Sequence, residues 1–180
     1  MGYQFSCLEY SSVLSGCLNS LGLKSRVIYL HPEDVETRTE SPVHVIVEVF
    51  LPFYDKWVYA DAQWDLIPML NDVPLNAVEF QESLFQVQPD LRFAGLTEAT
   101  FEEYTSFVAE YLYYFNTFLD HRHAGSEVQN KSKKIVMLFP IGVNKPRTIQ
   151  GYRLKQIYYT NSLAEFYQNP AKTDGISRIG

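Results

Sequence analysis

The spacing of hydrophobic residues predicts a helix at the start of the chain. Over residues 9–21 they recur at three- and four-residue steps, the pattern of one face of an amphipathic helix. The residues of this face are Tyr10, Val13, Leu14, Cys17, Leu18 and Leu21. Ser6 and Glu9 have the spacing of an N-terminal capping box, and Gly22 is expected to end the helix. Cys7 would then lie in the first helical turn.

β-branched and aromatic residues predict strands in the next segment. Residues 26–30 are expected to form one strand, followed by a polar loop. Residues 43–51 and 57–61 flank the linker Pro-Phe-Tyr-Asp-Lys, which is the pattern of an antiparallel hairpin. A turn centred in this linker would bring His44 and Asp61 onto the same face of the hairpin as diagonal neighbours, roughly 7–8 Å apart.

Two helices are predicted in the middle of the chain. Residues 76–88 have a short helical pattern. Thr100 and Glu103 form a second capping box, which opens a longer helix that Gly125 is expected to close. We expect the aromatic stripe of this helix to be a packing face rather than a cofactor site. The stripe consists of Phe101, Tyr104, Phe107, Val108, Tyr111, Leu112, Tyr114, Phe115, Phe118 and Leu119.

The last part of the chain predicts two strands and a short helix. Residues 135–143 are expected to form a strand at a sheet edge or with a bulge, because Pro140 cannot donate to a β-ladder. Residues 156–159 are expected to form a second strand that pairs with it. Ser162 can cap a final short helix, and residues 171–180 are expected to fray.

Length and charge narrow the classes of function. The 180 residues fit one domain, or one domain with an extension. A net charge of −6 argues against nucleic acid or an anionic membrane as the main partner, and the basic run at residues 131–134 is expected to be a solvated turn. No stretch approaches the roughly 18 apolar residues that a membrane helix needs, and no signal-peptide pattern is visible. The cellular compartment stays open.

The cysteine content indicates a free thiol rather than a disulfide framework. Cys7 and Cys17 are the only two cysteines, which is too few for such a framework. If they share the predicted helix, a rise of about 1.5 Å per residue separates them by roughly 15 Å, beyond the ~7 Å that a disulfide can bridge.

Three residues have the types and the order of a nucleophile, a base and an orienting acid. A thiol at a helix N-terminus, such as that of Cys7, has a lowered pKa, and the free N–H groups of the first turn can bind an oxyanion. His44 on one strand can act as the base, while Asp61 on the partner strand holds its second ring nitrogen. From spacing alone, a core cysteine and a hydrogen-bonded histidine remain the alternative.

The sequence around these residues resembles the transglutaminase-like superfamily of Cys-His-Asp enzymes. Residues 7–11, Cys-Leu-Glu-Tyr-Ser, and residues 21–27, Leu-Gly-Leu-Lys-Ser-Arg-Val, are similar to the family's nucleophile block and its helix exit. Residues 44–49, His-Val-Ile-Val-Glu-Val, look like its histidine strand, and residues 57–61, Trp-Val-Tyr-Ala-Asp, like its aspartate strand. The resemblance covers about a third of the chain, residues 3–65.

This resemblance implies an α+β fold with a papain-like core, in which an N-terminal helix carrying the cysteine packs on an antiparallel sheet. We expect residues 1–93 to form this core, with its N-terminus truncated, and residues 94–180 to form an α+β extension that can pack into the same domain. The implied catalytic residues are Cys7, His44 and Asp61.

Two residues depart from the family pattern beside the reacting atoms. Phe5 stands where the family often has glycine two residues before the cysteine, and Ile46 where it has an aromatic residue two after the histidine. Substrate access and oxyanion geometry can therefore differ from those of active members.

Other residues of the sequence could support the site or bind a ligand elsewhere. Gln4 could donate to the oxyanion, Glu48 is expected to be a structural hydrogen-bond partner, and Trp57 is expected to pack near the site. The Asp-His-Arg-His run at residues 120–123 is not expected to bind metal, since cationic residues are favoured at a helix C-terminus and its histidines point to different sides of a helix. The glycosylation pattern at residues 130–132 is expected to be coincidental.

The function that these observations predict is cysteine-dependent transfer of an acyl group from an amide through a thioester, with hydrolysis of a peptide or protein as the first choice. The alternatives are protein cross-linking by transamidation, deglycosylation of peptides, and a non-catalytic binding or scaffolding domain that interacts through residues 94–180. No cofactor or metal is expected, and oligomeric state stays open.

Overall fold

The computed structural model describes residues 6–95, 100–118 and 135–170, and the chain folds as an α+β protein. Its helices are α1 (Cys7–Ser20), α2 (Ala77–Phe85), α3 (Phe101–Val108), the 3₁₀ turn η1 (Ala109–Tyr111) and α4 (Leu163–Phe166). Its strands are β1 (Ser25–His31), β2 (His44–Leu51), β3 (Lys56–Ala60), β4 (Leu66–Leu70), β5 (Val73–Pro74), β6 (Leu91–Gly95), β7 (Tyr114–Phe118), β8 (Ile135–Leu138), β9 (Thr148–Ile149), β10 (Tyr152–Arg153) and β11 (Ile157–Thr160).

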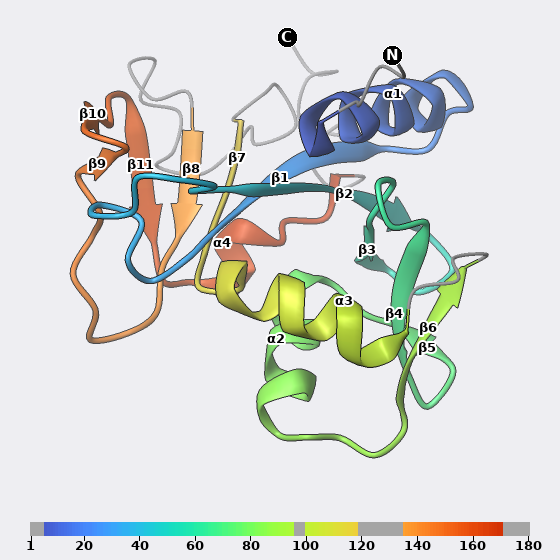
Figure 1. Ribbon diagram of the computed structural model, residues 1–180. Helices are drawn as coiled ribbons and strands as arrows, with labels where there is room; N and C mark the ends of the chain where they lie inside the picture. The colour runs from blue at the N-terminus through green and yellow to red at the C-terminus, as the bar shows by residue number, and fades with distance from the viewer. Residues whose placement is uncertain (1–5, 96–99, 119–134, 171–180) are drawn as a thin grey trace, which may run out of the picture.

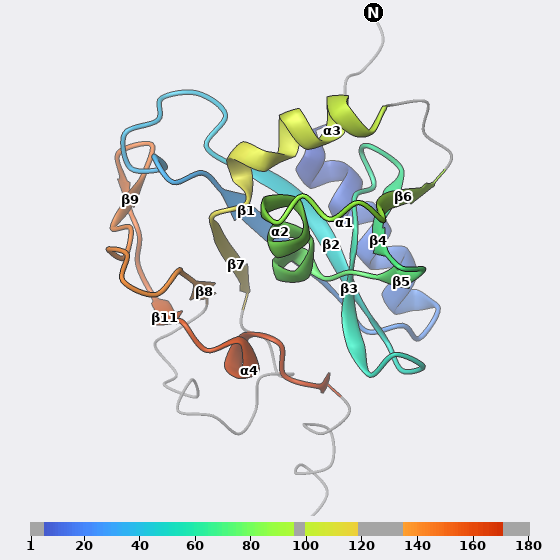
Figure 2. The same ribbon diagram turned by 90° about the horizontal axis from the view of Figure 1, so that it is seen from below.

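A six-stranded sheet with the order β11-β8-β7-β1-β2-β3 forms the centre of the molecule. Neighbouring strands are antiparallel except β8 and β11, which are parallel. Helix α1 lies on one face of this sheet, and α2, α3 and α4 lie on the other (Figures 1 and 2). A smaller sheet, β5-β4-β6, continues from the end of β3. Strands from the first and second halves of the chain therefore share one sheet.

The predicted hairpin is confirmed together with its register. Glu48 pairs with Tyr59 and Phe50 with Trp57, the pairing that follows from a turn centred in the Pro-Phe-Tyr-Asp-Lys linker. Asp55 in this turn has φ of 48°, a conformation that aspartate tolerates better than most residues. The register places alternate side chains of β2 and β3 on the same face of the sheet.

The predicted ends of the first helix are confirmed, but its orientation differs from the prediction. Ser6 accepts from the backbone N–H of Glu9, whose carboxylate accepts from the backbone of Ser6 at 2.6 Å. Gly22, with φ of 83°, follows the C-cap residue Leu21. The apolar stripe of this helix lies mostly outward, because the side chain that α1 buries is Ser11. Exposed residues of the stripe are Tyr10, Val13, Cys17 and Leu21.

The long helix predicted from Thr100 is wrong beyond its first turns. The capping box of Thr100 and Glu103 forms, but α3 gives way to η1 and then to β7. Strand β7 is flanked by β1 and β8, and its residues are buried except the last. The short aromatic run at residues 111–115 is compatible with a buried strand as well as with a helix, and periodicity alone does not distinguish the two. The proposed stop at Gly125 lies outside the described residues.

Of the remaining predictions, the caps of two helices and the pairing of the last two predicted strands are confirmed, but β8 is shorter than expected, and β4, β5, β6, β9 and β10 were not predicted. Asn76 caps α2 and Ser162 caps α4. β11 pairs with β8 in register from Ile157 to Thr160. β8 ends before Pro140, so the missing N–H of the proline falls outside the ladder, and the strand is internal rather than at an edge. The predicted tail at residues 171–180 lies outside the described residues.

The main hydrophobic core lies between the large sheet and the layer of α2, α3 and α4. Residues with no exposed surface from both sides meet there, among them Ile28, Ile46, Tyr59, Phe80 and Phe166. In the described ranges no helix has the length and apolar character needed to cross a membrane.

Candidate active site

Hydrogen bonds fix the start of α1 on the strand that carries His44. The buried Ser11 hydroxyl donates to the carbonyl of Val45 at 2.9 Å. One turn later, the hydroxyls of Ser15 and Ser25 lie 2.9 Å apart. Small hydroxyl side chains therefore replace the apolar stripe as the contact between helix and sheet, and they allow a close approach. Cys7, the first residue of the helix, is half-buried.

His44 and Asp61 form a buried pair. The Nε2 atom of His44 lies 2.6 Å from Oδ2 of Asp61, and their side chains are 2% and 0% exposed. Asp61 directly follows β3, and its second carboxylate oxygen accepts from the backbone N–H groups of Gln63 and Trp64 at 3.0 and 3.2 Å. These two bonds close a turn that fixes the carboxylate, as expected of an aspartate at a turn start.

Cys7 and His44 are coupled through a hydrogen bond and charge. Burial raises the pKa of the Cys7 thiol, but the hydrogen bond and charge of His44, with help from the backbone N–H groups of Val45 and Leu8, leave that pKa below its ordinary value. Because Nε2 faces Asp61, Nδ1 is the ring nitrogen available to the thiol. Cys7 can therefore form a thiolate beside an imidazolium.

The pKa of His44 shifts in the opposite direction to that of Cys7. Burial lowers its pKa, but hydrogen bonds to Asp61 and Cys7, with their charges, raise it to about 9. The imidazolium is therefore stable to well above neutral pH, and the lowered pKa of Cys7 implies that both charges coexist in a window below about 9.

Aromatic side chains cover His44 from the α3 side. The ring of Phe107 meets the imidazole edge-on at 5.0 Å, and Tyr111 lies at 6.0 Å. Trp64 packs on Phe107 at 5.2 Å. Among the described residues, the indole Nε1 of Trp64 is the buried side-chain polar atom without a hydrogen-bond partner. This cover keeps bulk water from the His44–Asp61 pair, which strengthens their interaction.

Sequence reasoning missed two tyrosines at this site, one that bonds to Asp61 and one that bonds to the first. The hydroxyl of Tyr104 donates to Oδ2 of Asp61 at 2.9 Å, and the hydroxyls of Tyr59 and Tyr104 lie 2.5 Å apart. Tyr59 could have been found, because it shares the strand face of Asp61 two positions earlier. Tyr104 comes from α3 and had no sequence signal other than its place in an aromatic stripe.

A third tyrosine lies beside the nucleophile. Burial raises the pKa of Tyr29, and the charge of the Cys7 thiolate raises it further. Tyr29 pairs with Val45 across β1 and β2, and its ring contacts Phe118 edge-on at 5.8 Å. Tyr29 is therefore close enough to the thiol to sense its charge, and Phe118 packs against Tyr29.

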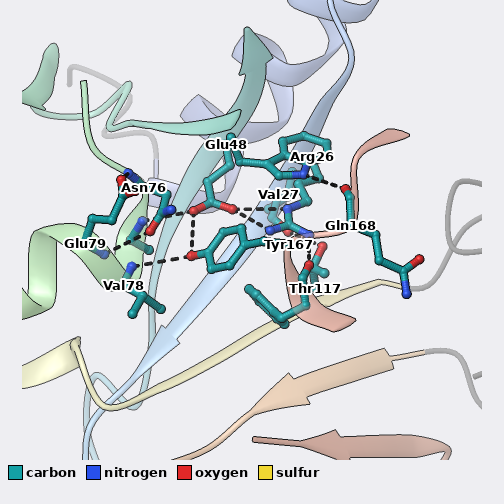
Figure 3. Close-up of polar contacts among 12 residues, drawn as sticks. Arg26, Val27, Glu48, Asn76, Val78, Glu79, Thr117, Tyr167 and Gln168 are labelled. Atoms are coloured by element: carbon teal, nitrogen blue, oxygen red, sulfur yellow. Dashed lines mark hydrogen bonds and ion pairs between the residues drawn. The ribbon is translucent and has the colours of Figure 1, made fainter. Parts of the chain in front are cut away.

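Glu48 and Trp57 belong to a second polar cluster, which Figure 3 shows around Arg26. The Glu48 carboxylate accepts from Arg26 Nη2 at 2.7 Å, from the Ala77 backbone N–H at 3.0 Å and from the Tyr167 hydroxyl at 3.1 Å. Trp57 stacks on the Arg26 guanidinium at 4.4 Å. Glu48 is thus a structural partner, as expected, and Trp57 lies four residues along β3 from Asp61, about 13 Å at the strand rise.

The remaining sequence candidates are located as follows. Gln4 and Phe5, and the runs at 120–123 and 130–132, lie outside the described residues. Ile46 is fully buried in the main core. Within the described ranges, no group of three or more His, Cys, Asp or Glu side chains could hold a metal ion.

Comparison with known proteins adds no assignment: no family model matches the chain, and no curated protein or solved structure matches it. The site therefore has to be interpreted from its own geometry and from its sequence motifs.

Proposed function

We propose that the chain is a cysteine-dependent acyl-transfer enzyme of the transglutaminase-like kind with a papain-like core, and that it hydrolyses amide bonds of peptides or proteins. Cys7 is the nucleophile, His44 the acid and base, and Asp61 the group that orients the imidazole. The proposal rests on one observation above all: a cysteine at a helix N-terminus is coupled to a histidine whose other nitrogen is held by a buried carboxylate.

The reaction begins with attack of the Cys7 thiolate on the substrate carbonyl carbon. The carbonyl oxygen becomes an oxyanion, which the backbone N–H of Cys7 at the start of α1 can bind, since Ser6 accepts from the N–H of Glu9 and the thiol accepts from that of Leu8. The imidazolium of His44 then gives its proton to the leaving nitrogen, so the amide C–N bond breaks and a thioester remains on Cys7.

The second half of the reaction uses neutral His44 as a base. It takes a proton from water, which attacks the thioester carbonyl, and collapse of the tetrahedral intermediate releases the acid and the thiolate. An amine in place of water would give transamidation by the same steps. Hydrolysis is the simpler proposal because no described residue marks a pocket for an amine.

Alkylation tests the thiolate–imidazolium pair without a substrate. Because the pKa of Cys7 is lowered, its rate of reaction with iodoacetamide is expected to rise with pH below the ordinary thiol range and to level off before pH 9. In a His44→Ala protein the rise should move to higher pH, so the rate at pH 6 falls about tenfold. Peptide mapping by mass spectrometry measures each cysteine separately.

The exposed Cys17 provides the matched control in the same samples. Its alkylation profile should be the same with and without His44, since it lies on another part of α1. A Cys7 profile that does not change when His44 is replaced would contradict the proposed pair.

A non-catalytic binding domain is the second candidate. The observation that favours it is the exposed apolar stripe of α1, in which Val13 is 67% and Leu21 78% exposed, since such surfaces often mark contacts with other proteins. The two candidates differ in what they require of the Cys7 thiol. A binding domain needs no coupling between Cys7 and His44, so the alkylation profile distinguishes the two.

A further inference from the structure

The Asp61 carboxylate is unusually well supplied with donors for a buried group. In the described part of the chain it accepts four hydrogen bonds: from His44 and Tyr104 on Oδ2, and from the Gln63 and Trp64 backbones on Oδ1. A carboxylate has about four acceptor positions. All the acceptor positions of the Asp61 carboxylate are thus filled. The side-chain donor besides His44 is Tyr104.

The direction of the tyrosine hydrogen bonds follows from the carboxylate. Asp61 can only accept, so the Tyr104 proton points to Oδ2 and its oxygen accepts from Tyr59 at 2.5 Å. Both tyrosine side chains are fully buried. Burial, with the charge of Asp61 as a further cause, raises the pKa of each hydroxyl well above its ordinary value. Both hydroxyls therefore stay protonated while His44 titrates.

We propose, on the basis of the function proposed above, that Tyr104 is a positioning residue whose hydroxyl shares the Asp61 oxygen that holds His44 and so limits how tightly Asp61 retains the imidazolium proton. Tyr59 supports it by donating to the same hydroxyl. A donor on Oδ2 draws negative charge away from the bond to His44, because buried hydrogen bonds polarise one another. His44 can then release its proton to the leaving group more readily.

Among the described residues, the titratable groups around this pair come from several elements. Cys7 of α1 faces His44 from one side, and Tyr111 of η1 lies 6.0 Å from its ring. Tyr104 of α3 bonds to Asp61, and Tyr59 of β3 bonds to Tyr104. Of these groups, Cys7 can change charge in the range where His44 titrates, so its contribution must be removed in a control.

The test is an NMR titration of His44 in protein labelled with ¹⁵N in the imidazole rings. Tyr104→Phe removes the hydroxyl and keeps the ring, and it is expected to raise the pKa of His44 by about half a unit to one unit. Tyr59→Phe leaves the Tyr104 bond in place and should shift the pKa in the same direction by less. This second variant keeps the test decisive if Tyr104→Phe does not fold.

Tyr167→Phe is the matched control, because it removes another tyrosine hydroxyl from another buried carboxylate, that of Glu48. It should lower stability without moving the His44 titration. No shift in Tyr104→Phe and Tyr59→Phe, or an equal shift in Tyr167→Phe, would overturn the proposal.

Repeating the titration with Cys7→Ala separates this inference from the proposed function. The His44–Asp61 pair exists without the thiol, so the Tyr104→Phe shift should persist in that background. A persistent shift together with an unreactive Cys7 in the alkylation experiment would support the role of Tyr104 while rejecting the enzyme. A reactive Cys7 without the shift would support the proposed enzyme and reject the role of Tyr104.

Discussion

Replacing Glu48 by alanine is expected to lower the free energy of unfolding by about 3–5 kcal/mol, the largest stability effect that we predict for a single side chain. The reason is that the buried Arg26 guanidinium would lose its counter-charge. Arg26 is 3% exposed at its side chain, and Glu48 supplies its carboxylate partner at 2.7 Å. Without Glu48 the guanidinium would be buried beside the rings of Trp57, Phe166 and Tyr167 with no counter-charge.

The same substitution removes a support for two helices. The N–H of Ala77, the first residue of α2, would lose its acceptor, and so would the hydroxyl of Tyr167 just after α4. Arg26 also donates to the carbonyl of Phe166 at 2.7 Å, so the pair connects β1 and β2 to the end of the described chain. Loss of Glu48 should therefore loosen the layer below the sheet.

Chemical denaturation measures the effect, with Glu110→Ala as the matched control. Glu110 pairs with Arg38 at 3.0 Å, but its side chain is 45% exposed, and exposed pairs contribute about 0–1 kcal/mol. Glu48→Gln, which keeps the shape and loses the charge, should fall between the two. Equal stability of Glu48→Ala and Glu110→Ala would contradict the structural role assigned to the buried pair.

Much of this fold could be predicted from the sequence, because helix caps and hairpin turns depend on residues that lie close together in the chain. The capping boxes at Ser6 and Thr100 form as expected, since a side chain three residues from its backbone partner needs no distant contact. The hairpin register of β2 and β3 also follows from a short linker. His44 and Asp61 could therefore be placed on one face before the structure was known.

What could not be predicted depends on contacts between distant segments. The aromatic run after Tyr111 fits a helix by spacing, and only pairing of β7 with β1 and β8 makes it a strand. α1 turns its apolar stripe outward because Ser11 bonds to Val45, 34 positions along the chain. The Tyr104 contact with Asp61 spans 43 positions, so no local pattern could show it.

The proposed site combines residues that local sequence patterns could predict with residues that they could not. The motifs around Cys7, His44 and Asp61 lie in the first third of the chain. The rings that cover His44 come from α3 and η1. The second half of the chain thus completes the environment of residues supplied by the first.

Cys7→Ala is expected to abolish acyl transfer, whereas Cys17→Ala should leave it unchanged. An activated ester, p-nitrophenyl acetate, serves as the probe, with release of nitrophenol followed optically and the acetylated residue found by mass spectrometry. We expect Cys7→Ala to lower turnover by about 10⁴-fold or more, because no other described group is placed to act as the nucleophile beside His44. Cys17 is exposed and lies ten positions further along α1.

Asp61→Asn extends this prediction to the orienting residue. The amide keeps the shape of the carboxylate, but it can present an N–H to His44 and favour the wrong tautomer, so turnover should fall by about 10²–10⁴-fold. Acetyl label on Cys7 that persists in this variant would indicate slow hydrolysis of the thioester, the step that needs neutral His44 as a base. Equal loss of turnover from Cys7→Ala and Cys17→Ala would contradict the assignment of Cys7 as the nucleophile, because the reaction would then not depend on the thiol that His44 contacts.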